Sequence, residues 1–140
     1  MYENILLAYD FDNKFNNVPA ELERLTSASD DSQITIFNVI SESELETSVR
    51  YKNVHFEELV EEKKEQLKPF IDELKSRDLN VSVKFKSGYI KQSILEEINE
   101  NNYDVIVMSN KRARPNIKNV LGNVTHKIAN SANIPVLIIK

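Results

Sequence analysis

The feature that most constrains this chain is a regular alternation of short apolar runs with longer stretches whose apolar residues recur every three or four positions. Short runs rich in β-branched residues are typical of strands, and the longer stretches are typical of amphipathic helices. Strands are predicted at 5–8, 33–40, 79–85, 103–108 and 135–139, and helices at 18–28, 56–74, 90–98 and 120–129. Residues 41–53 are polar and acidic and are predicted to form a loop or the frayed start of the helix that follows. Pro69 predicts a kink or a break near Lys68.

This alternation of strands and helices predicts the fold class. Each strand-helix-strand crossover is right-handed and places its helix on a face of a parallel sheet. We therefore expect a single domain over residues 1–140, an α/β fold with a doubly wound, five-stranded parallel sheet and helices on both faces, Rossmann-like in character. In such sheets ligands bind beyond the carboxyl ends of the strands, so function is expected at that edge.

Composition removes several classes of function. The chain has 140 residues, a net charge of -4 and no cysteine, which excludes disulfide scaffolds, thiolate metal sites and a cysteine nucleophile. Its lack of cysteine fits a reducing compartment, so cytoplasm is the expected location. We expect no signal peptide and no membrane span, because no apolar run is long enough for either.

Candidate catalytic and metal-binding residues are few. Asp10 and Asp12 form the only carboxylate pair expected at the carboxyl edge, where they could bind Mg²⁺ or cap the turn that follows the strand. His55 and His126 have no partner at metal-ligand spacing. The chain also lacks the nucleophile elbow, the phosphate-binding P-loop and the dinucleotide fingerprint, which argues against those enzyme classes.

One segment near the C-terminus is strongly basic. Residues 109–140 carry six basic side chains and no acidic one, and four of them form a basic segment: Lys111, Arg112, Arg114 and Lys118. We expect this segment either to attract an anionic partner or to be a solvated loop. Nucleic acid is not the expected partner, because residues 109–140 contain no aromatic side chain on which bases could stack.

Four segments of the chain resemble the universal stress protein family. They are ILLAYD at 5–10, the spaced Gly88 and Ile94, YDVIVMS at 103–109 and LGNVTHKIANSANIPVLII at 121–139. The resemblance implies the adenine nucleotide alpha-hydrolase-like version of the fold. Many members of that family bind ATP through a glycine-containing loop after the fourth strand, together with an aspartate after strand one and backbone near the end of strand two.

The family's ATP-binding positions match Asp10, Val39, Ser109, Arg112, Gly122 and Asn123 in this sequence. Ser109 and Arg112 stand where the family has glycine, and Asn123 stands where it has serine or threonine. Glycine permits close backbone approach and positive φ, and another residue forced into that conformation costs about 1–2 kcal/mol. The loop is therefore interpreted as eroded. Gly122 and Asn123 are expected to precede the last helix, where Asn123 would cap it and leave an anion site at its N-terminus.

Three functions follow from this reading. The first is a cytoplasmic stress-response or interaction protein that does not bind ATP tightly, with no required cofactor. The second is an ATP-binding universal stress protein with a variant phosphate loop, and the third is an adenine-nucleotide hydrolase or transferase that relies on Asp10 and Asp12. In each case the last strand, Pro135–Ile139, is expected at a sheet edge, where it would pair with a second copy in a homodimer.

Overall fold

A computed structural model of the chain confirms the doubly wound parallel sheet. The structure describes residues 2–26, 31–109 and 120–140, and for 120–123 it describes the helix but not the side chains. Its strands are β1 (Asn4–Ala8), β2 (Gln33–Ser41), β3 (Asn80–Gly88), β4 (Val105–Ser109) and β5 (Val136–Ile139). Its helices are α1 (Val18–Thr26), α2 (Glu42–Lys52), α3 (Phe56–Ser76), α4 (Ile90–Glu100) and α5 (Val120–Ser131).

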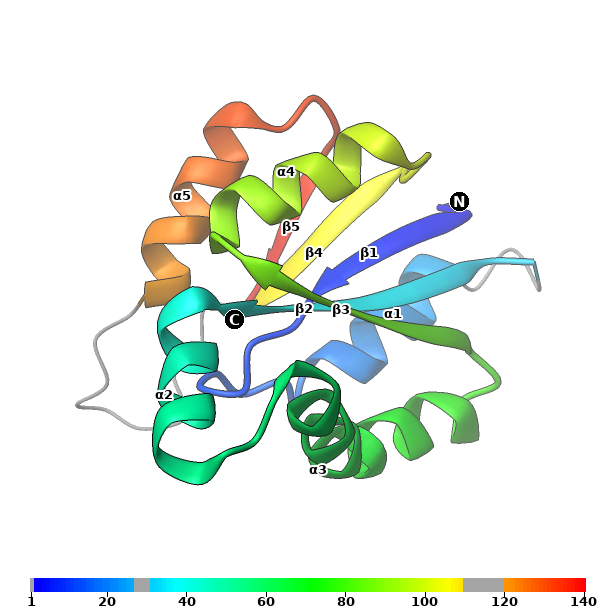
Figure 1. The fold of residues 1–140 in the computed structure, drawn as a ribbon. Coiled ribbons are helices and arrows are strands. Elements are labelled where there is room, and N and C mark those ends of the chain that lie inside the picture. The colour runs from blue at the N-terminus through cyan, green and yellow to red at the C-terminus, as the bar shows by residue number, and fades with distance from the viewer. Residues whose placement is uncertain (1, 27–30, 110–119) are drawn as a thin grey trace.

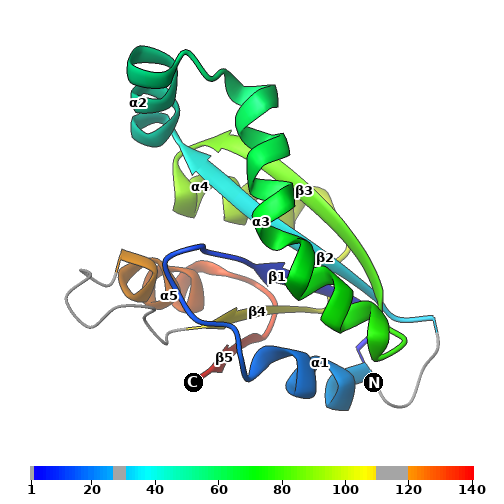
Figure 2. The ribbon, with the colours of Figure 1, turned by 90° about the horizontal axis from the view of Figure 1, so that it is seen from below.

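Helices cover both faces of the sheet, as expected. Helices α1 and α3 lie on one face and α4 and α5 on the other (Figures 1 and 2). The first face contains a core in which Leu22 of α1 and Leu67 of α3 pack against Ile5 and Leu7 of β1. The second contains a smaller core built from α4, α5 and the alternate residues of the same strands. Because both faces are buried, β1 and β4 read as unbroken apolar runs in the sequence.

The order of the strands positions the functional edge. The sheet runs β3-β2-β1-β4-β5, so the chain winds from β1 out to β3 and then returns to β4 on the other side of β1. Strands β1 and β2 are in register up to Ala8 and Phe37, and the Tyr9 amide donates to the Phe37 carbonyl at 2.9 Å. The segments that follow these strands therefore leave the sheet side by side, at the switch point of the topology.

The prediction of a loop at 41–53 is wrong, because these residues form α2. The Ser41 hydroxyl accepts a hydrogen bond from the Glu44 amide at 3.1 Å and caps the first turn. Asn53 ends the helix in the left-handed conformation, with φ of 54°. Only Ser48 of α2 is buried, which is why the sequence shows no apolar stripe there.

Of the predicted kink or break near Lys68, the break is wrong, because α3 continues through Pro69 to Ser76. Leu67 and Leu74 on either side of the proline are completely buried. Each buried leucine contributes about 1.5–3 kcal/mol, which together outweighs the cost of one proline in a helix, about 3 kcal/mol. Pro69 itself lies on the exposed side of the helix.

Two further features concern the borders of the fold. Strands β3 and β5 form the two edges of the sheet, which confirms the expected edge position of the last strand. Across the described residues, no helix is long and apolar enough to cross a membrane.

Candidate functional site

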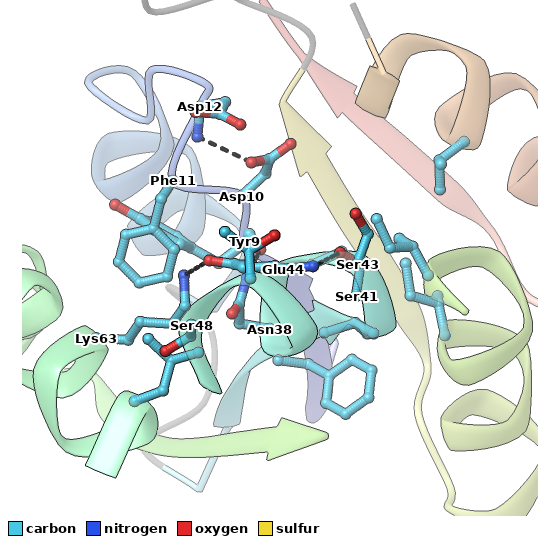
Figure 3. A pocket seen from close by; sticks show the side chains of 18 of the residues that line it. Tyr9, Asp10, Phe11, Asp12, Asn38, Ser41, Ser43, Glu44, Ser48 and Lys63 are labelled. Atoms are coloured by element: carbon cyan, nitrogen blue, oxygen red, sulfur yellow. Dashed lines mark hydrogen bonds and ion pairs between the residues drawn. The ribbon is translucent and has the colours of Figure 1, made fainter. Parts of the chain in front are cut away.

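A cavity of about 540 Å³ opens at the carboxyl edge of the sheet. One wall, the sheet wall, consists of the residues at and just beyond the ends of β1 and β2 (Figure 3). The opposite wall, the helical wall, comes from α2 and α3. Helices α4 and α5 add apolar residues: Ile90, Ile94 and Val124. The cavity therefore lies where the topology predicts a ligand site, and its volume falls within the range of small-molecule pockets.

Asp10 is one of two acidic residues in the sheet wall, together with Asp12. It follows β1, and its carboxylate accepts a hydrogen bond from the Asp12 amide at 2.8 Å, which closes a tight turn. Burial raises the pKa of Asp10 above its usual range, and the carboxylates of Asp12 and Glu44 add to this. The Asp12 amide and the Lys63 ammonium group act in the opposite direction and lower the pKa. A carboxylate held in this way accepts hydrogen bonds from hydroxyl or amine groups of a ligand.

Asn38 lies beside Asp10 at the end of β2. Its side-chain amide donates to the Tyr9 carbonyl at 2.8 Å, which ties the two strand ends together. Because the Tyr9 carbonyl can only accept, this contact fixes the orientation of the amide. The side-chain oxygen of Asn38 is buried and has no donor among the described residues. Val39, the next residue, also lines the cavity.

A cluster of aromatic rings supports the turn after β1. Tyr9 stacks on Phe15 with ring centres 4.3 Å apart. It also forms a T-shaped pair with Phe11 and a tilted pair with Phe70, with ring centres 5.0 and 5.2 Å apart. Such contacts contribute roughly 0.5–1.5 kcal/mol each beyond the area that they bury. The segment that carries Asp10 is thus fixed on one side by the sheet and on the other by packed rings.

The helical wall is polar. Five residues of α2 line the cavity from one face of the helix: Ser43, Glu44, Thr47, Ser48 and Lys52. An ion pair of 2.8 Å between Glu44 and Lys63 joins α2 to α3 in this wall. The Lys63 ammonium group also lies 4.6 Å from the centre of the Phe11 ring, within the range of a cation-π contact.

The structure brings together only some of the residues predicted from the sequence. Asp10 and Val39 both line the cavity. Ser109 ends β4 but turns toward the loop after β1, where its hydroxyl donates to the Lys14 carbonyl at 2.7 Å and its own carbonyl accepts from Asn13 at 3.0 Å. It is not among the lining residues.

The other predicted positions lie near or beyond the limit of the described residues. The expectation that Gly122 and Asn123 precede the last helix is wrong, because α5 begins at Val120 and contains both. Asn123 is therefore not its cap, since the helix already includes three residues before it. Arg112 and the rest of the basic segment (Lys111, Arg114, Lys118) lie outside the described residues.

Sequence reasoning missed the helical wall entirely. The signal for α2 was present as the pattern Ser41-x-x-Glu44, which is typical of a helix N-terminus. Lys63 lies in a run of acidic and basic residues, a pattern typical of a solvated helix face, and only the tertiary fold shows that it is buried. Among the described residues, no three histidine or acidic side chains come together as a metal site.

The fold and the site together define a Rossmann-like α/β domain with a ligand cavity at its switch point. The family model of the universal stress protein family matches residues 1–140, so the chain belongs to that family. No curated protein matches the sequence.

Solved structures show the same fold. Protein MJ0577, the subject of a structure-based functional assignment, is 24% identical with a TM-score of 0.80, over 100% of this chain and 96% of its own. A universal stress protein in complex with cAMP is 15% identical with a TM-score of 0.69, over 99% and 97%. An Arabidopsis thaliana family protein with AMP bound is 17% identical with a TM-score of 0.63, over 99% and 91%.

Proposed function

We propose that this universal stress protein is a cytoplasmic, non-enzymatic stress-response module that binds the nucleoside part of an adenine nucleotide in the cavity at the carboxyl edge. The observation that carries the proposal is the position of Asp10 and Val39 in one wall of that cavity. Acceptors such as the Asp10 carboxylate suit the hydroxyl groups of a ribose, and the apolar side chains of α4 and α5 suit a base. Relatives with AMP or cAMP bound support this choice of ligand.

We further propose that the triphosphate of ATP is held weakly. Ser109 and Arg112 replace loop glycines of the family, and Ser109 does not have a positive φ in this structure. If phosphate binding requires a positive φ at both positions, the two replacements together cost about 2–4 kcal/mol. The Ser109 hydroxyl is also engaged with the Lys14 carbonyl. The basic segment of Lys111, Arg112, Arg114 and Lys118 is proposed to attract anions through side-chain charge instead, with a strong dependence on salt.

Isothermal titration calorimetry with adenosine, AMP, ADP and ATP, each with and without Mg²⁺, tests the proposal. We expect adenosine and AMP to bind and ATP to gain little from its extra phosphates. Thr47→Trp should block binding, because Thr47 lines the cavity from the exposed helix α2. The control is Glu46→Trp on the same helix, since Glu46 is exposed and does not line the cavity.

Two results would contradict the proposal in different ways. If adenosine and AMP do not bind to the wild-type chain, the nucleoside site is wrong. If ATP binds at least tenfold more tightly than AMP, which corresponds to about 1.4 kcal/mol, the weak phosphate site is wrong and the variant loop is functional. Release of phosphate from ATP by the pure protein would favour the hydrolase alternative.

We also propose that the chain forms a homodimer through β5. Ile138 of this edge strand is 37% exposed, and its neighbours are apolar. The opposite edge strand, β3, carries Lys84 and Lys86, whose charges oppose pairing with another strand. Analytical ultracentrifugation should give a dimer for the wild type and a monomer for Ile138→Lys. Ser87→Lys on the β3 edge is the control and should stay dimeric. A wild-type monomer at micromolar concentration would contradict the proposal.

A further inference from the structure

Lys63 is an unusual residue on the surface helix α3. A lysine is almost never fully buried unless it is paired, yet only 8% of Lys63 is exposed. Its ammonium group points into the helical wall of the cavity, between Glu44 and the Phe11 ring (Figure 3). The ion pair with Glu44 measures 2.8 Å, and the ring centre is 4.6 Å away. The Glu44 side chain is 45% exposed, so the lysine is the more deeply buried partner.

The charged residues that line the cavity with Lys63 are mostly acidic. Asp10 and Asp12 come from the turn after β1, Glu44 comes from α2, and Lys63 comes from α3. Lys52, at the exposed end of α2, is the second cation of the described lining residues. Lys63 and Glu44 both act electrostatically on Asp10, in opposite directions. Three carboxylates therefore share a half-buried pocket with one buried cation.

We propose that Lys63 is a positioning residue of the nucleoside site, whose buried ammonium group in the cavity wall favours a negatively charged Asp10 carboxylate for the ligand to meet, while Glu44 opposes that effect. This inference rests on the proposed function for its ligand, a nucleoside with hydroxyl donors. It assigns α2 and α3 a part in binding, although neither helix carries a residue that matches the family's ATP-binding positions. The charge of Lys63 acts through Asp10, so Lys63 need not touch the ligand.

A purely structural role for the ion pair makes a different prediction. Lys63→Met and Glu44→Gln both break the same contact between α2 and α3, so a structural role predicts the same direction of change for both. The proposed electrostatic role predicts opposite directions. Loss of the lysine removes a positive charge near Asp10 and raises its pKa further, whereas loss of Glu44 removes a negative charge and lowers it.

The decisive experiment is an NMR titration of the Asp10 carboxyl carbon in the ligand-free protein. We expect the titration midpoint to move to higher pH in Lys63→Met and to lower pH in Glu44→Gln. The midpoint of the double variant should lie between those of the two single variants. The midpoint of Lys63→Arg, which keeps the charge, should be closer to the wild-type value than that of Lys63→Met. The proposal would be overturned if the titration midpoints do not change, or if they shift in the same direction in the two single variants.

A second experiment measures the affinity of the same variants for adenosine as a function of pH. Affinity should be lost below a midpoint that moves in the same order as the carboxyl titration, with Lys63→Met the first to lose binding as the pH falls. If adenosine does not bind even to the wild type, the proposed function fails, and the NMR titration still decides whether Lys63 controls Asp10. If adenosine binds but the midpoint of its pH-dependent affinity is the same in both variants as in the wild type, the role of Lys63 in binding is wrong.

Discussion

The two walls of the cavity are built in different ways. The sheet wall follows from strands β1 and β2, in which most residues are buried and which are joined by a regular parallel ladder. The helical wall includes α2, of which only Ser48 is buried, and it is joined to α3 by the ion pair between Glu44 and Lys63. One wall is fixed by the core, and the other is held by a few polar contacts on top of it.

This difference makes the sheet wall the rigid part of the site and the helical wall the part that can adjust. Residues on the sheet wall cannot move without disturbing the ladder and the aromatic cluster behind Tyr9. Elements with few buried apolar contacts open locally at a smaller free-energy cost, and ligand-binding segments are often of this kind. We therefore expect the sheet wall to define the geometry of binding and α2 to adapt to the ligand.

The largest expected effect compares one leucine from each side. Leu7→Ala in β1 removes a completely buried side chain and should lower the free energy of unfolding by about 2–5 kcal/mol. Leu45→Ala in α2 removes a half-buried side chain and should cost about 1 kcal/mol or less. Urea unfolding followed by circular dichroism measures both. Equal losses for the two variants would show that α2 is as firmly packed as the sheet.

A second prediction uses the raised pKa of Asp10. Because the pKa of Asp10 is raised, the folded state binds the Asp10 proton more tightly than the unfolded state does. The resulting contribution to stability is fully present below the pKa of the unfolded state. It is lost as the pH rises through the pKa of the folded state. Asp10→Asn should therefore make the chain more stable at neutral pH than the wild type, and the gain should disappear in acid. Urea unfolding at several pH values checks the sign.

Asp10→Asn should also weaken ligand binding. Hydrogen bonds to a charged group contribute about 1.5–3 kcal/mol, so Asp10→Asn should lower adenosine affinity roughly 10- to 100-fold. Asp72→Asn is the matched control, because Asp72 is exposed and does not line the cavity. If the Asp10 variant is both less stable and equally able to bind, the sheet wall does not work as described.

A third prediction concerns the attachment of α2. Ser41→Ala removes the side chain that caps the helix and should cost about 1 kcal/mol, seen mainly as faster hydrogen exchange of the amides in α2. Ser43→Ala leaves the cap intact and serves as control. Exchange that accelerates equally in β2 would show that α2 and the sheet open as one unit.

The smallest effect is expected for the hydroxyl groups of the helical wall. Thr47→Val keeps the shape of an exposed side chain and should change stability by no more than about 0.5 kcal/mol. If α2 adapts to the ligand, adenosine affinity should fall less than about tenfold, since one neutral hydrogen bond contributes about 0.5–1.5 kcal/mol. A larger loss by calorimetry would place Thr47 among the fixed contacts of the site.

Within the described residues, the apolar pattern was enough to predict the strands, four of the five helices and the edge where the cavity lies. Those elements bury apolar side chains, and a buried face leaves a period of two or 3.6 residues in the sequence. Asp10 was expected at this edge because it follows the first strand, and Val39 was predicted from the resemblance to the universal stress protein family. Helix α2 was missed because its capping serine and polar face leave no such period.

What the sequence by itself determined is thus the layered fold and the sheet wall, both of which depend on local periodicity and on the chirality of the crossovers. Tertiary structure alone decided that Lys63 is buried, that it pairs with Glu44 and that Ser109 turns away from the cavity. The physical reason is that a charge or a hydroxyl group takes its role from the partners within a few ångströms. Glu44 and Lys63 come from separate helices, and the sequence does not state that those helices meet.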